Sequence, residues 1–227
     1  MPFAKIYIVR HGETQSNKES IIQGQLDTEL NETGIEQARR VADVLRCVHF
    51  DAAYSSDLVR ALKTAQIILE HRTDIEIQRE EDLRERFLGD MQGTKIGAGI
   101  LKRVAGNDTV EPTGVISARA VGWWKKAVLQ RTRALPARET AYNVLVTSHG
   151  GWIMTLIRTL VGSGRARCAP GVELTTCHNT SVTIIDLELG DEPATIVQFG
   201  YVAHLTQGPE DKIVDTNVDE AVVDAAK

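Results

Sequence analysis

The sequence predicts an α/β protein: a three-layer αβα sandwich with a mainly parallel sheet, helices on both faces and one antiparallel strand at an edge. Three observations lead to this prediction. Short β-rich runs alternate with amphipathic helical segments along most of the 227 residues, an order typical of parallel sheets covered by helices. The run 143–147 is apolar enough for a strand buried on both faces. No linker rich in Pro, Gly or Ser divides the pattern, so we expect a single catalytic domain at 1–208.

The first half of the chain begins the alternation. The short run Lys5–Val9 predicts a strand, and residues 33–46 carry apolar side chains at helical spacing, which predicts a surface helix. A second strand is expected at 51–55. Ser56 has the side chain of a good N-cap, so we expect it to cap a helix over 57–70.

The second half continues in the same way. The expected strands are 75–78, 143–147, 181–187 and 194–200, and the expected helices are 117–133 and 152–161. The strand near 75–78 is the weakest of these predictions because its run is short and only partly apolar.

Composition and charge exclude several classes of protein. Hydrophobic residues make up 42% and charged residues 25% of the chain, as in an ordinary globular protein. The net charge of −5 argues against a protein whose main function is to bind nucleic acid or an anionic membrane. No run approaches the roughly 18 apolar residues of a membrane span. Three cysteines without a CxxC pair indicate no disulfide framework and no thiolate metal site, so we expect a reducing, cytoplasmic setting.

Most of the negative charge belongs to the end of the chain. Residues 209–227 contain six acidic residues and two lysines, a net charge of −4, and we expect a loosely attached acidic C-terminal tail there. The rest of the chain is therefore almost neutral, and a local positive site within it is compatible with the overall charge.

Two histidines follow predicted strands, His11 after Lys5–Val9 and His149 after 143–147. Ligands of open α/β sheets bind at the carboxyl ends of the strands, so we expect the two to share a site. Each is followed by glycine, which lets the backbone approach a ligand. Arg10 and Arg60 add cations at the same edge, and guanidinium groups suit phosphoryl oxygens.

These residues belong to five motifs that occur in order. They are Arg10-His11-Gly12-Glu13-Thr14 with Asn17 and Gln23-Gly24; Ser56-Asp57-Leu58-Val59-Arg60-Ala61; Leu83-Arg84-Glu85-Arg86 with Gly89; Ser148-His149-Gly150-Gly151; and Asn179-Thr180-Ser181-Val182. Together, from Ile6 to His204, they resemble the histidine phosphatase superfamily, in its phosphoglycerate-mutase-like branch.

The resemblance implies a phosphatase that acts on a small phosphorylated substrate and needs no metal or other cofactor. His11 would attack the phosphoryl group to give a phosphohistidine, and Glu85 would protonate the leaving alcohol. The further catalytic residues would be Arg10, Arg60 and His149, which hold the phosphoryl oxygens, and the substrate-binding residues would be Asn17, Gln23, Gly24 and Gly150.

Other interpretations of the same residues stay open at this point. Without the resemblance, Glu85 would be a solvated member of the charged run 79–86. Ser148 lacks the GxSxG sequence of a serine hydrolase and is expected to be structural. A zinc site built from Glu85, His11 and His149 would lack the short spacing of known zinc motifs, and the adjacent arginines would repel the cation.

Departures from the family pattern bear on the substrate. Gly114 is followed by Val115, where the family often has glutamate, and Phe87-Leu88 replaces the His-Tyr pair typical of mutases. The segment between Gly89 and Trp123, glycine-rich over 93–106, occupies the place of the substrate-covering insertion. We therefore expect a phosphatase that resembles the small broad-specificity members or the fructose-2,6-bisphosphatase-like ones. We expect it to be a monomer or homodimer, without nucleic acid or membrane partners. The alternatives are a bisphosphate-primed phosphoglycerate mutase and a non-catalytic phosphate-binding module.

Overall fold

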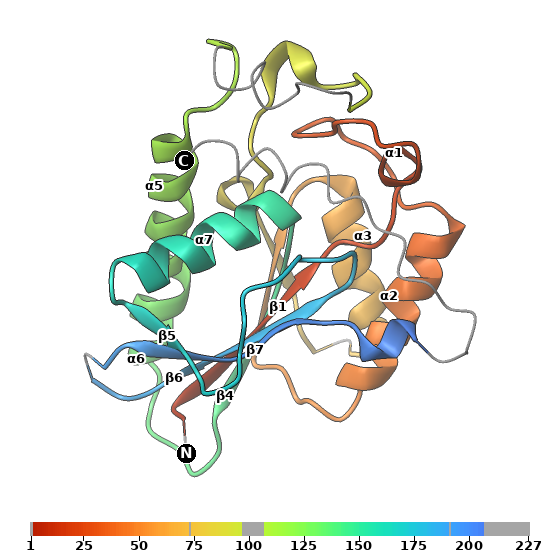
Figure 1. The fold of residues 1–227 in the computed structure, drawn as a ribbon. Helices are drawn as coiled ribbons and strands as arrows, with labels where there is room; N and C mark the ends of the chain where they lie inside the picture. Colours follow the sequence, from red (N-terminus) through yellow and green to blue (C-terminus); the bar gives the residue numbers. More distant parts are fainter. Residues whose placement is uncertain (1, 73, 97–106, 191, 207–227) are drawn as a thin grey trace.

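The structure, a computed structural model, describes residues 2–72, 74–96, 107–190 and 192–206 (Figure 1). Its strands are β1 Ala4–Arg10, β2 Ala52–Ser56, β3 Ile77–Glu80, β4 Tyr142–Ser148, β5 Ala166–Cys168, β6 Val182–Leu187 and β7 Ala194–Tyr201. Within the described residues they form one sheet in the order β3-β2-β4-β1-β6-β7-β5.

Helices connect the strands. The α-helices are α1 Gln15–Lys18, α2 Glu32–Leu45, α3 Val59–Ile68, α5 Thr113–Trp123, α6 Arg131–Arg133 and α7 Gly150–Gly162. The 3-10 turns are η1 Glu81–Leu83, η2 Gly89–Met91 and η4 Ala203–Leu205, and the segment η3, Trp124–Gln130, is a π-helix. The single helix expected at 117–133 is therefore a continuous run of α5, η3 and α6.

Alternating side chains of the central strands build a core on each face of the sheet. In β1, Ile6 and Ile8 pack into the core under α5 and α7, whereas Tyr7 and Val9 pack into the core under α2 and α3. Figure 1 shows these two helix pairs on opposite sides of the sheet. This arrangement is the three-layer sandwich that the sequence predicts.

The direction of the strands agrees with the predicted fold class. The pairs β1–β4, β2–β4, β2–β3 and β5–β7 are parallel, whereas β6 runs antiparallel to β1 and to β7. The antiparallel strand that we expected at an edge is thus β6, with β7 and β5 outside it. The sequence did not predict β5, the strand at this edge, because it has only three residues and no recognisable period.

The predicted capping of the second helix is wrong. Helix α3 begins at Val59 rather than at 57, and its N-cap residue is Leu58, which makes no side-chain cap. A carboxylate oxygen of Asp27, from a loop 32 residues earlier, accepts a hydrogen bond from the Val59 backbone N–H at 2.7 Å. It thereby caps the N-terminus of the helix. The Ser56 hydroxyl accepts from the Leu58 N–H at 3.3 Å, before the helix begins, and contacts His149 Nε2 at 2.9 Å.

Some expectations fall outside the described residues. The acidic tail 209–227 and most of the glycine-rich segment 93–106 belong to this part of the chain. Among the residues that are described, no helix has both the length and the apolar character needed to cross a membrane.

Candidate active site

The two histidines lie together because their strands are neighbours. In the parallel pair β1–β4, Arg10 is in register with Ser148, so His11 and His149 leave the sheet at the same edge. The His11 N–H donates to the Ser148 carbonyl over 3.0 Å, and the two imidazole ring centroids are 5.2 Å apart. Both side chains are fully buried.

The His11 ring is held in one tautomer. Its Nδ1 lies 2.7 Å from the Gly12 carbonyl oxygen, and since a carbonyl can only accept, Nδ1 carries the proton. In the neutral ring Nε2 therefore has a lone pair, toward which Nε of Arg60 donates over 3.3 Å. Burial first, and then the charges of Arg60 and Arg10, hold the pKa of His11 well below its usual value.

The backbone around His11 is held from several directions. The Gly12 N–H donates to the hydroxyl of Thr64 in α3 at 3.0 Å, and the Asn179 side-chain amide donates to the His11 carbonyl at 2.9 Å. A Cβ at Gly12 would lie 2.4 Å from the Gly34 carbonyl oxygen, so the close approach of α2 requires glycine. These contacts hold the imidazole in place.

The two arginines give the site a positive field. Arg10 and Arg60 are 1% and 0% exposed. Arg10 comes from the end of β1 and donates from Nη1 to the Cys177 carbonyl at 2.8 Å. Arg60, in the first turn of α3, donates from Nη1 to the Leu26 carbonyl and from Nη2 to the Gly24 carbonyl, both at 2.7 Å.

His149 sits at the N-cap position of α7. Its Nε2 is 2.9 Å from the Ser56 hydroxyl, and its buried Nδ1 has no hydrogen-bond partner among the described residues. Burial, followed by the charges of Arg60, His11 and Arg10, holds its pKa well below the usual value. Both rings are thus neutral at neutral pH.

Glu85 is buried, so it is not a solvated member of the charged run. Its Oε1 accepts from the Arg86 N–H at 2.8 Å, and its Oε2 accepts from the Gly151 N–H at 2.9 Å. A Cβ at Gly151 would lie 2.5 Å from Oε1. The carboxyl group is therefore seated against the first turn of α7, two residues beyond His149.

The expected substrate-binding residues are also near this edge. The Thr14 hydroxyl is 3.0 Å from Asn17 Oδ1 and 2.9 Å from Gln23 Oε1, and it joins these two buried side chains. Gln23 Nε2 is buried without a hydrogen-bond partner among the described residues. Gly24 has a positive φ of 51°, which favours glycine, and Gly150 is the buried first residue of α7.

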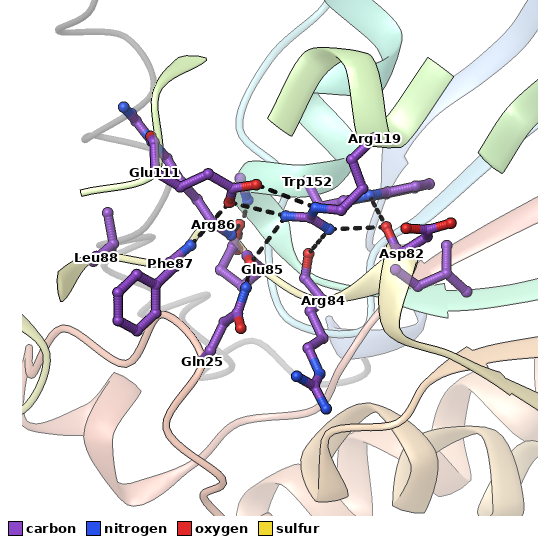
Figure 2. Close-up of polar contacts among 12 residues, drawn as sticks. Gln25, Asp82, Arg84, Glu85, Arg86, Phe87, Leu88, Glu111, Arg119 and Trp152 are labelled. Atoms are coloured by element: carbon purple, nitrogen blue, oxygen red, sulfur yellow. Dashed lines mark hydrogen bonds and ion pairs between the residues drawn. The ribbon is translucent and has the colours of Figure 1, made fainter. Parts of the chain in front are cut away.

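Sequence reasoning missed residues that contact the backbone around Glu85, among them Gln25, whose Nε2 donates to the Glu85 carbonyl at 3.0 Å. Arg119 of α5 and Glu111, just before α5, bond to the backbone on both sides of Glu85 (Figure 2). The first turn of α5 has no acidic residue, in line with Val115 after Gly114, and Glu111 pairs with Arg119 from just before the helix. The sequence around Arg119 does not indicate that its side chain would bind backbone carbonyls from a distant segment.

Other candidate chemistry is not assembled at this edge. The Ser148 hydroxyl donates to the Leu83 carbonyl at 2.7 Å, a structural contact. In the part of the chain that the structure describes, no three His, Cys, Asp or Glu side chains are grouped to hold a metal ion. A cavity of about 270 Å³ near Phe3 and Leu187 lies at the start of β1, the opposite end of the sheet from His11.

Comparisons with known proteins agree with one another. Residues 6–198 match the profile of the histidine phosphatase superfamily (branch 1). The chain is 38% identical to phosphoglycerate mutase-like protein 4 of Arabidopsis thaliana over 90% of this chain and 88% of that one. It is 29% identical to a broad-specificity phosphatase of Saccharomyces cerevisiae, with the same two coverages. The crystal structure of phosphoglycerate mutase from Bacillus anthracis superposes with a TM-score of 0.73 at 26% identity, over 88% of this chain and 94% of that one.

Proposed function

The chain belongs to the histidine phosphatase superfamily (branch 1) and is a phosphatase of that type, and from this premise we propose a specific reaction. It hydrolyses small phosphorylated metabolites without a metal, through a phosphohistidine on His11, with Glu85 as the proton donor. The observation that carries the proposal is the hydrogen bond from His11 Nδ1 to the Gly12 carbonyl at 2.7 Å. It leaves the Nε2 lone pair available as a nucleophile in a ring whose pKa is lowered.

The first step transfers the phosphoryl group to the enzyme. The Nε2 lone pair of His11 forms the N–P bond as the P–O bond to the leaving group breaks. The electron pair of the broken bond stays on the leaving oxygen, which takes the proton of the Glu85 carboxyl group. In this step Arg60 Nε exchanges its hydrogen bond with Nε2 for one with a phosphoryl oxygen.

The surrounding cations stabilise the transition state. Phosphoryl transfer needs positioning and charge stabilisation more than covalent chemistry, and buried cations supply both. Burial is the main cause of the lowered pKa values of His11 and His149, and the charges of Arg60 and Arg10 lower them further, which supports a positive field where the phosphate would lie. With the Ser56 hydroxyl donating to Nε2 of His149, the Nδ1–H of this ring is free to donate to a phosphoryl oxygen.

The second step returns the enzyme to its starting state. Water attacks phosphorus, Glu85 accepts a proton from it, and the N–P bond breaks with its electron pair returning to His11 Nε2. Asn17, Gln23, Gly24 and Gly150 would contribute to substrate binding, and the buried donor Nε2 of Gln23 supports its part in this. Residues 1–208 would form the catalytic domain, in the cytoplasm.

The experiment is a panel of phosphomonoesters in EDTA, with wild-type enzyme and His11→Ala compared. We expect phosphate release by the wild type, a loss of more than about 10³-fold for His11→Ala, and an acid-labile phosphoenzyme only when His11 is present. His71→Ala is the matched control, because His71 is exposed on the surface, and it should keep full activity.

Each alternative function has its own outcome. No hydrolysis of any substrate in EDTA, or full activity of His11→Ala, would refute the proposal. Interconversion of 3- and 2-phosphoglycerate that outpaces phosphate release would establish a mutase instead. Binding of phosphate without turnover and without a phosphoenzyme would establish a binding module.

A further inference from the structure

Glu85 lies in a segment without regular secondary structure. Between the end of η1 at Leu83 and the start of η2 at Gly89, the backbone belongs to neither a helix nor a strand. The N–H and C=O groups of such a buried segment need partners from elsewhere in the chain. A catalytic side chain must also be held within a fraction of an ångström of its working position, so the partners of this segment matter for its chemistry.

The N-terminal side of the segment is held by Arg119. Figure 2 shows the guanidinium group of this α5 residue among three carbonyl groups. Nη1 donates to the carbonyls of Asp82 and Arg84 at 2.9 and 2.8 Å, and Nη2 donates to the Glu85 carbonyl at 3.4 Å. Arg119 thus binds three carbonyls of this backbone. Two of them also accept from other side chains, that of Asp82 from Trp152 Nε1 at 2.7 Å and that of Glu85 from Gln25 Nε2 at 3.0 Å.

The C-terminal side of the segment is held by Glu111. Its Oε2 accepts from the Phe87 N–H at 3.1 Å, and its own N–H donates to the Phe87 carbonyl at 2.8 Å. The Glu111 carbonyl in turn accepts from Nε of Arg86 at 2.7 Å. The two residues that follow Glu85 are therefore tied to Glu111 by three hydrogen bonds.

An ion pair joins the two anchors. Arg119 Nη2 is 3.0 Å from Glu111 Oε2, and Arg119 Nε donates to Oε1 at 3.2 Å, a two-point pair with restricted geometry. The side chains are only 16% and 11% exposed. Such a pair resists solvent screening more than a surface pair does, and it links both sides of Glu85 to α5.

We propose that Arg119 and Glu111 are positioning residues that hold the Glu85 carboxyl group in line with the leaving oxygen. The inference rests on the proposed function, in which the P–O bond breaks, its electron pair goes to the leaving oxygen, and that oxygen takes the Glu85 proton. Both residues bind the backbone around Glu85, whereas the carboxyl oxygens themselves accept from the Arg86 and Gly151 N–H groups. Their effect on the reaction is through the position of Glu85.

A positioning role predicts a dependence on the leaving group that a general structural role does not. An alkoxide is a poor leaving group and needs the proton, whereas 4-nitrophenolate leaves readily without it. A misplaced Glu85 therefore slows phosphoryl transfer to the enzyme much more from an alkyl phosphate than from 4-nitrophenyl phosphate. The kcat/KM reports this transfer, whereas kcat also includes the second step, in which Glu85 takes a proton from water with either substrate. Loss of folded enzyme would lower both rates equally.

The experiment compares kcat/KM for glycerol phosphate and 4-nitrophenyl phosphate in the wild type, Glu85→Gln, Arg119→Met, Arg119→Lys and Glu111→Gln. For Arg119→Met we expect a loss of roughly 100-fold with the alkyl substrate and less than about 3-fold with the aryl substrate, the pattern of Glu85→Gln. Arg119→Lys keeps the charge but not the forked geometry, so it should restore the alkyl rate only in part. Glu111→Gln should show the same selectivity with a smaller loss.

Arg138→Met is the matched control. Arg138 also pairs with a carboxylate, that of Asp51 at 2.6 Å, and also donates to backbone carbonyls, those of Thr140 and Ala141. These contacts lie before β2 and β4, at the other end of the sheet from Glu85. Both rates should stay at the wild-type level in this variant.

The outcomes separate the inference from its premise. If the wild type hydrolyses neither substrate, the proposed function fails. If Glu85→Gln lowers both rates equally, Glu85 is not the proton donor. If Glu85→Gln is selective for the alkyl substrate but Arg119→Met and Glu111→Gln lower both rates equally or not at all, the positioning role alone is overturned. Should Arg119→Met not fold, Glu111→Gln and Arg119→Lys decide the matter.

Discussion

The backbone N–H of Gly151 donates to Oε2 of Glu85 over 2.9 Å, and a Cβ at residue 151 would lie only 2.5 Å from Oε1 of the same carboxyl group. Two segments separated by 66 residues are therefore fitted together at this contact. The first turn of α7 carries His149 at its N-cap. The contact thus sets the position of the expected proton donor relative to one of the expected phosphate ligands.

We expect Gly151→Ala to displace the Glu85 carboxyl group, because the added methyl cannot share its position. The kcat/KM for an alkyl phosphate should fall by roughly 100-fold, with a smaller loss for 4-nitrophenyl phosphate. Gly162→Ala, at the other end of the same helix, is the control: its Cβ would meet nothing within 4 Å, and its activity should be unchanged. Wild-type kinetics in Gly151→Ala would contradict this account of the contact.

The acid side of the pH profile should reflect the lowered pKa of His11. The nucleophile is lost only when Nε2 gains a proton, and burial with Arg60 and Arg10 holds that pKa well below 6.5. The substrate itself titrates near about pH 6, so its ionisation is first corrected for in the kcat/KM profile. The corrected kcat/KM should then stay level as the pH falls through 6.5 and decline only at lower pH. An enzyme pKa at or above 6.5 in kcat/KM would show that the site does not stabilise the neutral ring.

Phosphate should stabilise the folded enzyme through the buried arginines. At ten times its Kd, a ligand that binds only the native state adds about 1.4 kcal/mol, or about 3–6 °C in Tm for a domain of this size. We expect such a rise with inorganic phosphate for the wild type and a much smaller one at the same concentration for Arg60→Lys, because lysine lacks the fork that reaches Gly24 and Leu26. Arg138→Lys should respond like the wild type, and equal shifts in both variants would count against Arg60 as a phosphate ligand.

His204 should make stability depend on pH outside the active site. Burial, with the charge of Arg40, lowers its pKa to about 4, and its Nε2 is 3.2 Å from the Thr180 hydroxyl. The unfolded chain takes up the proton near pH 6.5 but the folded one only near 4, so this group destabilises the fold progressively as the pH falls from 6.5 to 4.

The substitution His204→Gln removes the imidazole group that takes up this proton. Between neutral pH and about pH 4, the variant should lose about 2 kcal/mol less free energy of unfolding than the wild type, measured by urea titration. His71→Gln changes an exposed histidine and should follow the wild type. Parallel pH profiles for the wild type and His204→Gln would show that His204 does not contribute.

Much of the fold could be predicted from local patterns. The helix predicted at 33–46 is α2 at Glu32–Leu45, and the strand predicted at 143–147 is β4 at Tyr142–Ser148, because periodicity and apolar runs are local properties. The three-residue strand β5 and the π-helix η3 were not predicted. Neither has a period of its own, and both form because the packed neighbours on either side determine the backbone there.

The candidate site divides in the same way. The sequence placed His11 and His149 after two strands, and parallel pairing of those strands brings the residues together. It did not show that Asp27 would cap α3, since the two residues in that contact are 32 positions apart. Nor did it show that Glu85 would be buried between the Arg119–Glu111 pair and Gly151.

The sequence by itself determined the alternation of strands and helices, the family motifs, and the ends of β1 and β4 at which the histidines stand. Only the tertiary structure decided that the Glu85 carboxyl group is buried, which backbone carbonyls accept hydrogen bonds from the arginines, and which residues hold Glu85 in place. The physical reason is that periodicity and turn chemistry act over a few neighbouring residues, whereas a buried polar group is satisfied by whichever partner the packed fold brings within hydrogen-bond distance.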